Sequence, residues 1–152
     1  MTITKMLQGL RHAKFIGKNY SKDPRTKVGA LILRADGTPV SWGYNGFPRG
    51  IVETAELWKN REEKYKRVLH AESNAIDFAR ESLEGTTIFC SLFPCSNCAA
   101  RIVQAGIKTV VFEGEPREDL GAKIAFEMFS QANIAVIQKK EDDRMARILT
   151  WQ

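Results

Sequence analysis

The residues with the clearest chemical potential are a histidine, a glutamate and a pair of cysteines. His70 and Glu72 stand two positions apart, and Cys95 and Cys98 follow further along the chain at CxxC spacing, directly after Pro94. One imidazole and two thiolates, each presented at the start of a predicted helix, are soft ligands suited to Zn²⁺. Three ligands leave the fourth tetrahedral position open to water, which is typical of catalytic rather than structural zinc.

The rest of the chain offers no fourth ligand with motif-like spacing. The sequence holds two histidines and three cysteines, so His12 and Cys90 are left over, and the apolar surroundings of Cys90 predict a core residue. Pro94 fixes the backbone where the second helix begins, and the positive end of that helix favours the thiolate forms of the cysteine pair. We therefore expect one catalytic zinc ion per subunit. The predicted ligands are His70, Cys95 and Cys98.

Glu72 has a different predicted task. On a helix, a residue two positions beyond His70 points to another side of the turn, so Glu72 is not expected to ligate the metal. A carboxylate beside an activated water can take its proton and deliver it to a ring nitrogen and then to leaving ammonia. In the alternative interpretations, the cysteines are packing or redox residues, or the chain is a zinc-bearing binding module without activity. A binding module has no need of an acid at this position.

Hydrophobic periodicity predicts the elements that position these residues. Apolar residues at helical spacing predict a helix over the first twenty residues, ending near Gly17. Strands are predicted at 28–33, 39–44, 86–90, 109–112 and 134–137, the first two joined by a turn at Asp36 and Gly37. Helical segments are predicted within 53–67, from residue 71 to an end at Gly85, at 95–105, at 120–130 and at the charged C-terminus. This order predicts an α/β fold, a three-layer α/β/α sandwich around a mixed, mostly five-stranded sheet.

The composition bounds the class of protein. The 152 residues, 43% of them apolar, suit one compact domain over residues 1–152. No apolar run is long enough for a membrane helix, and residues 1–10 lack the pattern of a signal peptide, so we expect a cytoplasmic protein with reduced cysteines. The net charge of +5 suits a protein that handles phosphates, but acidic and basic residues are interleaved along the chain.

Beyond the metal motif, three segments carry a resemblance to a known family. Residues 21–30 read SKDPRTKVGA, residues 43–50 read GYNGFPRG, and residues 70–76 read HAESNAI, with Ser73 where the family often has an apolar residue. Together with the PCSNC motif at 94–98, the chain resembles the cytidine deaminase superfamily and, within it, the deoxycytidylate (dCMP) deaminases. The resemblance implies a cytidine deaminase-like fold. It also implies zinc-dependent hydrolysis of dCMP to dUMP and ammonia, which supplies dUMP for thymidylate synthesis.

The same resemblance implies which residues bind the substrate. Asn45 would bind the deoxyribose 3′-hydroxyl, and the Ala71 N–H would donate to the pyrimidine O2. Carbonyls around Ser91 and Leu92 would hold the 4-amino group, and Val28 would contact the ring. The loop that enters the first strand would hold the monophosphate. Its implied substrate-binding residues are Ser21, Arg25, Thr26 and Lys27.

The glycine-rich segment 43–50 has a second implied role. Its N–H groups could cradle a phosphate, and the resemblance implies an allosteric site activated by dCTP and inhibited by dTTP with Mg²⁺, in a homohexamer. The implied effector residues are Gly43, Tyr44, Gly46, Phe47, Arg49 and Gly50. The alternative is a plain surface loop.

Two related enzymes compete with this interpretation. A tRNA adenosine deaminase would share the zinc core and would need an RNA-binding surface near the C-terminus. Here that end carries Glu141, Asp142 and Asp143, and segment 46–50 favours a nucleotide substrate. Deaminases of free cytidine usually have a cysteine in place of His70. We expect neither a membrane nor a nucleic acid as partner.

Overall fold

The computed structural model describes residues 1–140 and the backbone of residues 147–149. In this part of the chain the helices are α1 (Ile3–Tyr20), α2 (Ala55–Lys59), α3 (Arg61–Arg67), α4 (Ala71–Phe78), α5 (Ser96–Gln104) and α6 (Leu120–Gln131). The strands are β1 (Gly29–Leu33), β2 (Pro39–Tyr44), β3 (Thr87–Cys90), β4 (Thr109–Glu113), β5 (Ala135–Lys139) and β6 (Arg147–Leu149). All five predicted strands are therefore present, close to their predicted bounds.

The described strands form one mixed sheet in the order β2-β1-β3-β4-β5-β6. β1 pairs antiparallel with both β2 and β3, whereas β3, β4 and β5 run parallel to one another. The antiparallel hairpin and the parallel second half are both as predicted. Since β3 and β4 are parallel, the loops that follow them emerge at the same edge of the sheet, where α/β proteins commonly bind ligands.

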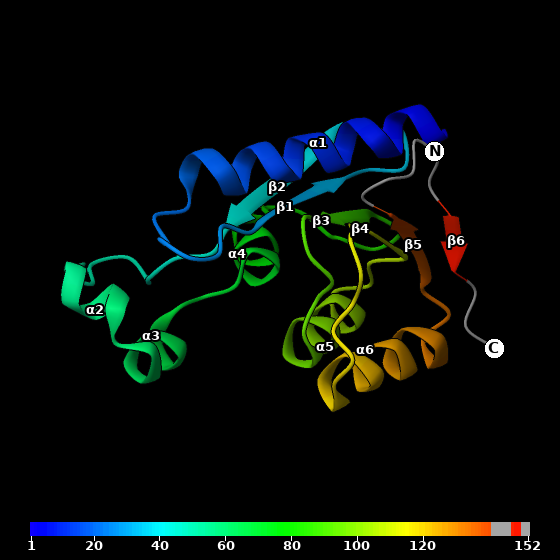
Figure 1. The fold of residues 1–152 in the computed structure, drawn as a ribbon. Coiled ribbons are helices and arrows are strands. Elements are labelled where there is room, and N and C mark those ends of the chain that lie inside the picture. Colours follow the sequence, from blue (N-terminus) through cyan, green and yellow to red (C-terminus); the bar gives the residue numbers. More distant parts are fainter. Residues whose placement is uncertain (141–146, 150–152) are drawn as a thin grey trace.

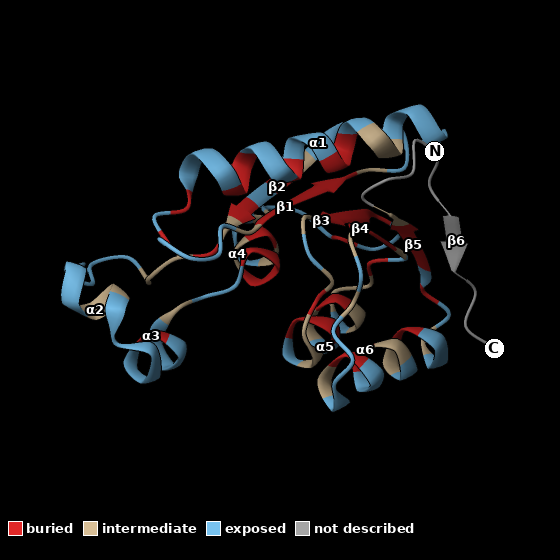
Figure 2. Cartoon of the chain, viewed as in Figure 1, coloured by how far each residue is buried: buried red, intermediate tan, exposed pale blue. Residues whose placement is uncertain are grey.

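Helices cover both faces of the sheet and complete the predicted three-layer sandwich (Figure 1). On one face α1 packs alone, with Leu10, Ala13 and Ile16 against Phe89 of β3 and Val111 of β4. On the other face α4, α5 and α6 enclose the larger core cluster. Figure 2 shows the central strands buried between these layers, while the outer helix surfaces are exposed. No helix of the described residues is both long and apolar enough to cross a membrane.

The predicted end of the first helix at Gly17 is wrong, because α1 continues to Tyr20. Gly17 instead allows α1 to lie very close to the start of β1. A Cβ atom on Gly17 would come within 2.6 Å of the Gly29 backbone nitrogen. One on Gly29 would come within 1.9 Å of the Ala13 carbonyl oxygen. Two glycines in contact therefore set the distance between this helix and the sheet.

Two further predictions of helix ends need correction. α4 ends at Phe78 rather than near Gly85, since Ala79 is already extended, and Gly85 lies with a φ of +75° in the turn before β3. The predicted C-terminal helix is wrong at Arg147–Leu149, which form β6 antiparallel to β5. This pairing satisfies backbone groups that the edge of β5 would otherwise leave open. The remaining residues of that predicted helix lie outside the described part of the chain.

Candidate metal centre and active-site pocket

Two helix starts bring the predicted metal ligands together. His70 is the N-cap of α4 and Cys95 is the N-cap of α5, both with extended backbone, and Cys98 lies in the first turn of α5. The His70 Nδ1 atom is 3.4 Å from the Sγ atom of Cys95 and 3.4 Å from that of Cys98. The predicted trio is thus a spatial cluster.

The cluster fits a zinc ion by its chemistry and its spacing. Zn–S bonds of about 2.3 Å and Zn–N bonds of about 2.0 Å in a tetrahedron separate nitrogen and sulfur ligands by roughly 3.5 Å, close to the observed contacts. Among the described residues, these three side chains are the group of histidine, cysteine and acidic residues that could hold a metal ion. Cys90 stands apart from it, fully buried in β3.

The environment of the cluster favours a thiolate at one of the two sulfurs. The hydrogen bond from Cys98 lowers the pKa of Cys95 to about 3, and the same contact raises the pKa of Cys98. The hydrogen bond with Cys95 in turn raises the pKa of His70. The two sulfurs share one thiolate charge, next to an imidazole and at a helix N-terminus. Such a site favours the binding of a cation.

Glu72 lies in the first turn of α4 and is 4% exposed. Burial raises the pKa of its carboxyl group. It lines the same pocket as His70 and Cys95 but does not belong to the ligand cluster. An acid that is buried beside the centre without ligating it can hold or pass on a proton, as the sequence predicts for Glu72.

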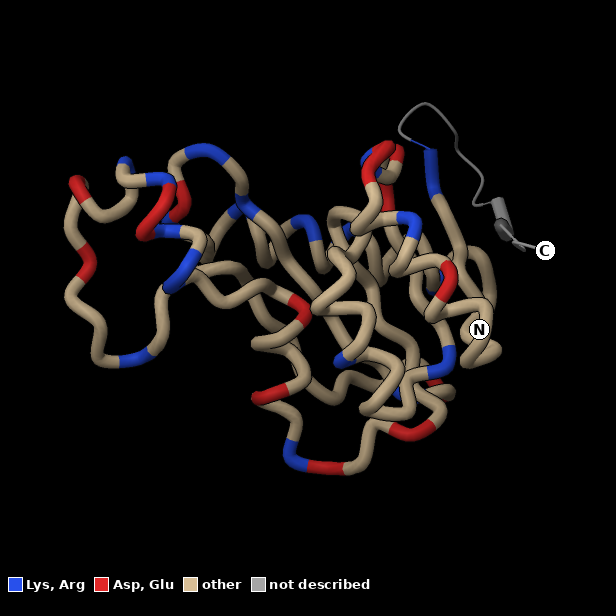
Figure 3. Tube along the Cα trace, turned by 90° about the horizontal axis from the view of Figure 1, so that it is seen from below, with Lys and Arg blue, Asp and Glu red and all other residues tan. Residues whose placement is uncertain are grey.

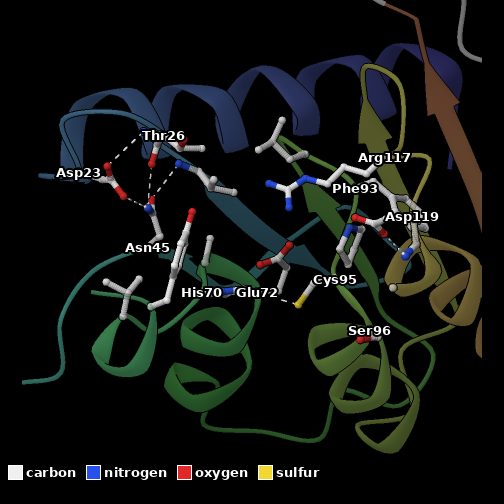
Figure 4. A pocket seen from close by; sticks show the side chains of 18 of the residues that line it. Asp23, Thr26, Asn45, His70, Glu72, Phe93, Cys95, Ser96, Arg117 and Asp119 are labelled. Atoms are coloured by element: carbon white, nitrogen blue, oxygen red, sulfur yellow. Dashed lines mark hydrogen bonds between the residues drawn. The ribbon is translucent and has the colours of Figure 1, made fainter. Parts of the chain in front are cut away.

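A pocket of about 440 Å³ opens above these residues, a volume that suits a small-molecule ligand. In Figure 4, His70, Glu72 and Cys95 lie together at the centre of the pocket. Asp23, Thr26 and Asn45 line one side, and Phe93, Arg117 and Asp119 line the other. The pocket thus combines loops before β1 and after β2, β3 and β4.

A buried polar network stiffens the first of these sides. The Lys64 Nζ atom, from α3, lies 2.7 Å from the Asp23 Oδ2 atom. Burial by itself would raise the pKa of Asp23, but hydrogen bonds from Lys64 and from backbone N–H groups hold it below its usual range. The Asn45 amide donates to the Thr26 carbonyl at 2.8 Å and accepts from the Val28 N–H at 2.8 Å. These bonds fix the orientation of the Asn45 side chain.

The structure divides the predicted substrate-binding residues into two groups. The first group lines the pocket: Thr26, Val28, Asn45, Ala71 and Leu92. The second group does not line it: Ser21, Arg25, Lys27 and Ser91.

Three side chains of the second group make contacts within the protein. Lys27 donates to the Ser21 carbonyl at 2.5 Å, and the Ser21 hydroxyl donates to the Asn45 carbonyl at 3.0 Å. The Ser91 hydroxyl accepts from the Gly29 N–H at 3.0 Å. The role predicted for the first two residues, holding a phosphate, stays a prediction.

The six residues predicted to bind effectors do not line this pocket, although Asn45 of the same segment does. Gly43 packs against α4, and Gly46 pairs through its backbone with Leu69. The other predicted effector residues lie as follows: Tyr44 is stacked on Tyr20, Phe47 is against Trp58, Arg49 is over the Phe78 ring, and Gly50 has a φ of +78° in open space. The effector role of this segment stays a prediction.

Sequence reasoning missed several residues of the site. The Ser73 hydroxyl lies 3.7 Å from the Cys98 sulfur, so this residue contacts a predicted ligand. The signal for this residue in the sequence was its polar side chain, at a position where the family often has an apolar residue. Lys64 and Arg117 line the pocket from distant segments, and nothing in their local sequence indicates it.

The fold and the site together define a class of protein. A histidine and two cysteines at helix starts, with a buried glutamate two residues after the histidine, are typical of the zinc-dependent nucleobase deaminases. Residues 6–114 match the family described as "Cytidine and deoxycytidylate deaminase zinc-binding region", and the chain belongs to this family.

Individual relatives show how similar the chain is to particular deaminases. An "Uncharacterized deaminase in luxG 3'region" from Aliivibrio fischeri is 45% identical over 129 residues, covering 82% of this chain and 86% of the relative. The human deoxycytidylate deaminase is 37% identical over 124 residues, covering 75% and 70%. The dCMP deaminase of cyanophage S-TIM5, solved in complex with dCMP and dUMP, has a TM-score of 0.74 and 28% identity. That comparison covers 91% of this chain and 99% of the phage protein.

Proposed function

We propose that this chain hydrolyses dCMP to dUMP and ammonia. The observation that carries the proposal is the position of the buried Glu72 beside the His70, Cys95 and Cys98 cluster, in one pocket of nucleotide size. The names of the human and cyanophage relatives support dCMP as the substrate. Family membership itself establishes a deaminase of cytidine or deoxycytidylate type.

Different residues of the pocket carry out different parts of the proposed reaction. A zinc ion held by the cluster would supply the Lewis acidity that makes water a nucleophile near neutral pH. Glu72 accepts a proton from the attacking water and passes it to the ring N3, while the water oxygen bonds to C4. Glu72 then takes the second proton from the new C4 hydroxyl and delivers it to the 4-amino group. The C4–N bond breaks, ammonia leaves, and C4 becomes the carbonyl of dUMP.

Other residues orient the ring for this transfer. The Ala71 N–H lies in the first turn of α4, where N–H groups have no acceptor within the helix, and it can donate to the pyrimidine O2. Asn45, fixed by its bonds to Thr26 and Val28, lines the pocket and would contact the sugar there. Val28 and Leu92 supply apolar contact to the ring.

Ammonia release with dCMP, cytidine, dCTP and a tRNA anticodon stem tests the substrate. We expect the highest kcat/KM with dCMP. A higher value for the RNA stem or for cytidine would reject dCMP as the substrate and leave the deaminase chemistry intact.

A variant of the acid tests the chemistry separately. Glu72→Gln should retain zinc and lower kcat about 10²- to 10⁴-fold, because a proton carrier is lost while the ligands remain. Asp77→Asn is the matched control, an exposed carboxylate on the same helix that pairs with Arg101. Unchanged turnover in Glu72→Gln would reject Glu72 as the proton carrier, and a zinc-loaded wild type that releases no ammonia would favour a zinc-binding module over an enzyme.

Regulation and assembly form a second part of the proposal. The resemblance to dCMP deaminases supports activation by dCTP, inhibition by dTTP with Mg²⁺, and a homohexamer. Titration of dCMP turnover with each nucleotide, alongside light scattering for the mass, tests this part. A monomer with turnover that neither nucleotide changes would contradict it.

A further inference from the structure

Arg117 is a pocket residue that neither the motif nor the predicted phosphate loop includes. It lies between β4 and α6, in the loop that follows the carboxyl end of a parallel strand. Arg117 is exposed at the pocket mouth, and Figure 4 shows its guanidinium directed into the pocket. The positive charge therefore faces the space that a substrate would fill.

Apart from Glu72 and the predicted metal ligands, the other charged side chains of the pocket wall are already engaged. Lys64 is neutralised by Asp23 at 2.7 Å. Glu115 accepts from Gln138 at 3.1 Å and pairs with Lys140 at 3.2 Å. Asp119 caps α6 by accepting from the Ala122 N–H at 2.8 Å.

Arg117 differs from all of these. Within the described residues it is the lysine or arginine of the pocket wall that makes neither an ion pair nor a hydrogen bond with the protein. Figure 3 shows acidic and basic positions interleaved along the described chain. Among the basic side chains of the pocket wall, Arg117 is therefore the one whose charge is left for an anion.

We propose that Arg117 binds the 5′-phosphate of the substrate and thereby selects nucleotides over nucleosides. This inference rests on the proposed function, since it takes a cytosine nucleotide as the ligand. In such a nucleotide the phosphate lies at the opposite end from the 4-amino group. With the amino group at Glu72, the phosphate reaches the pocket mouth, where a planar guanidinium can bind two phosphate oxygens at once.

The proposal differs from the phosphate site predicted at residues 21–27. Lys27 donates to the Ser21 carbonyl, and the Ser21 hydroxyl donates to the Asn45 carbonyl. These groups hold the loop in place and do not line the pocket. A phosphate site at Arg117 and one at the 21–27 loop therefore predict opposite effects of single substitutions on dCMP turnover.

Kinetics with dCMP and deoxycytidine test the proposal on the zinc-loaded protein. Arg117→Met should lower kcat/KM for dCMP about tenfold to a hundredfold, the usual range for a lost hydrogen bond to a charged group. The loss should appear mainly in KM, and kcat/KM for deoxycytidine should change less than about twofold. Arg117→Lys should recover part of the loss, because it keeps the charge without the planar pair of donors.

Two further variants serve as comparisons. Arg80→Met removes the same charge from an exposed position outside the pocket wall and should alter neither substrate. Arg25→Met tests the loop. A selective loss of dCMP turnover in Arg25→Met but not in Arg117→Met would overturn the proposal, and so would an equal loss on both substrates in Arg117→Met.

The wild-type protein separates this inference from the proposed function. If the wild-type protein deaminates deoxycytidine as efficiently as dCMP, dCMP is rejected as the specific substrate. Phosphate selection by Arg117 is then rejected with it, before any variant is considered. Calorimetry with the product pair dUMP and deoxyuridine adds a readout that needs no turnover. We expect wild type to prefer dUMP and Arg117→Met to lose that preference. A preference that persists in the variant would overturn the role of Arg117 alone.

Discussion

The Lys64 ammonium lies 2.7 Å from the Asp23 carboxylate, with both side chains almost fully buried, at 9% and 3% exposure. This ion pair joins α3 to the loop after α1. In Figure 1, α2 and α3 extend away from the sheet and the other helices. The pair thus attaches this extension to the wall of the pocket that holds Asn45.

Loss of this ion pair should weaken both stability and substrate binding. Lys64→Met leaves a buried carboxylate without its cation, so we expect the free energy of unfolding to fall by about 3 kcal/mol and KM for dCMP to rise. The double variant with Asp23→Asn should recover part of the stability, because no buried charge remains. Urea unfolding measures the first effect and steady-state kinetics the second. Lys66→Met, exposed on the same helix, should cost less than about 0.5 kcal/mol. An equally mild Lys64→Met would contradict a structural role for the pair.

The cysteines should differ in their effect on zinc. Cys98→Ala removes a ligand, so zinc affinity should fall by more than about 10²-fold, beyond the usual cost of losing a supporting contact. Ser73→Ala, which removes that kind of contact, should cost about tenfold. Cys90→Ala should keep full zinc and lose about 1–2 kcal/mol of stability, because Cys90 is a buried core residue. Competition with a chromophoric chelator measures the affinities. Zinc loss in Cys90→Ala would show that the metal depends on core packing rather than on the ligand cluster.

Gly43→Ala tests whether the predicted effector segment also supports the metal centre. A Cβ atom at this position would lie 2.5 Å from the Ala71 carbonyl oxygen and 2.5 Å from the Ala75 nitrogen, both backbone atoms of α4. Since α4 carries Glu72 and begins at His70, we expect a loss of about 1–3 kcal/mol together with weaker zinc binding. Gly46→Ala, whose Cβ atom would meet its nearest neighbour at 3.9 Å, should be nearly neutral in urea unfolding. If Gly43→Ala instead kept its stability and its zinc but lost the response to dCTP, its main role would be in effector binding.

Glu113 gives the chain a predictable dependence of stability on pH. Burial alone would raise the pKa of Glu113, but hydrogen bonds from Lys139 and Lys14 outweigh it and leave the pKa below its usual range. A lowered pKa in the folded state stabilises the fold above the unfolded value of about 4.3, and that contribution is lost as the pH falls through the folded pKa.

A comparison of wild type with Glu113→Gln isolates this contribution. At pH 7 the variant should be less stable by roughly 1–3 kcal/mol, the range for hydrogen bonds to charged groups. Urea unfolding between pH 7 and pH 3 should show this difference shrinking below about pH 4. A difference that stays constant across the range would mean that the ion pairs do not stabilise the fold.

The sequence by itself determined the cluster of His70, Cys95 and Cys98 and most of the elements, while the acid role of Glu72 stays a prediction. These depend on local spacing: a histidine and a CxxC pair at helix starts form a cluster once each helix begins where its N-cap dictates, as His70 and Cys95 show. Short apolar runs predicted β1 to β5 equally well, whereas β6 was missed. The ends of helices were less predictable, since Gly17 and Gly85 serve packing and a turn instead of ending α1 and α4.

The tertiary structure alone decided which side chains complete the pocket. Lys64 and Arg117 reach it from α3 and the loop after β4, and Ser73 of α4 contacts the Cys98 sulfur behind it. Their approach depends on how the strands and the helices that connect them are stacked. It also decided that Lys27 makes a hydrogen bond within its own loop. Spacing along a chain specifies neighbours within one element, whereas contacts between loops far apart in sequence arise only when the sheet brings their strands together.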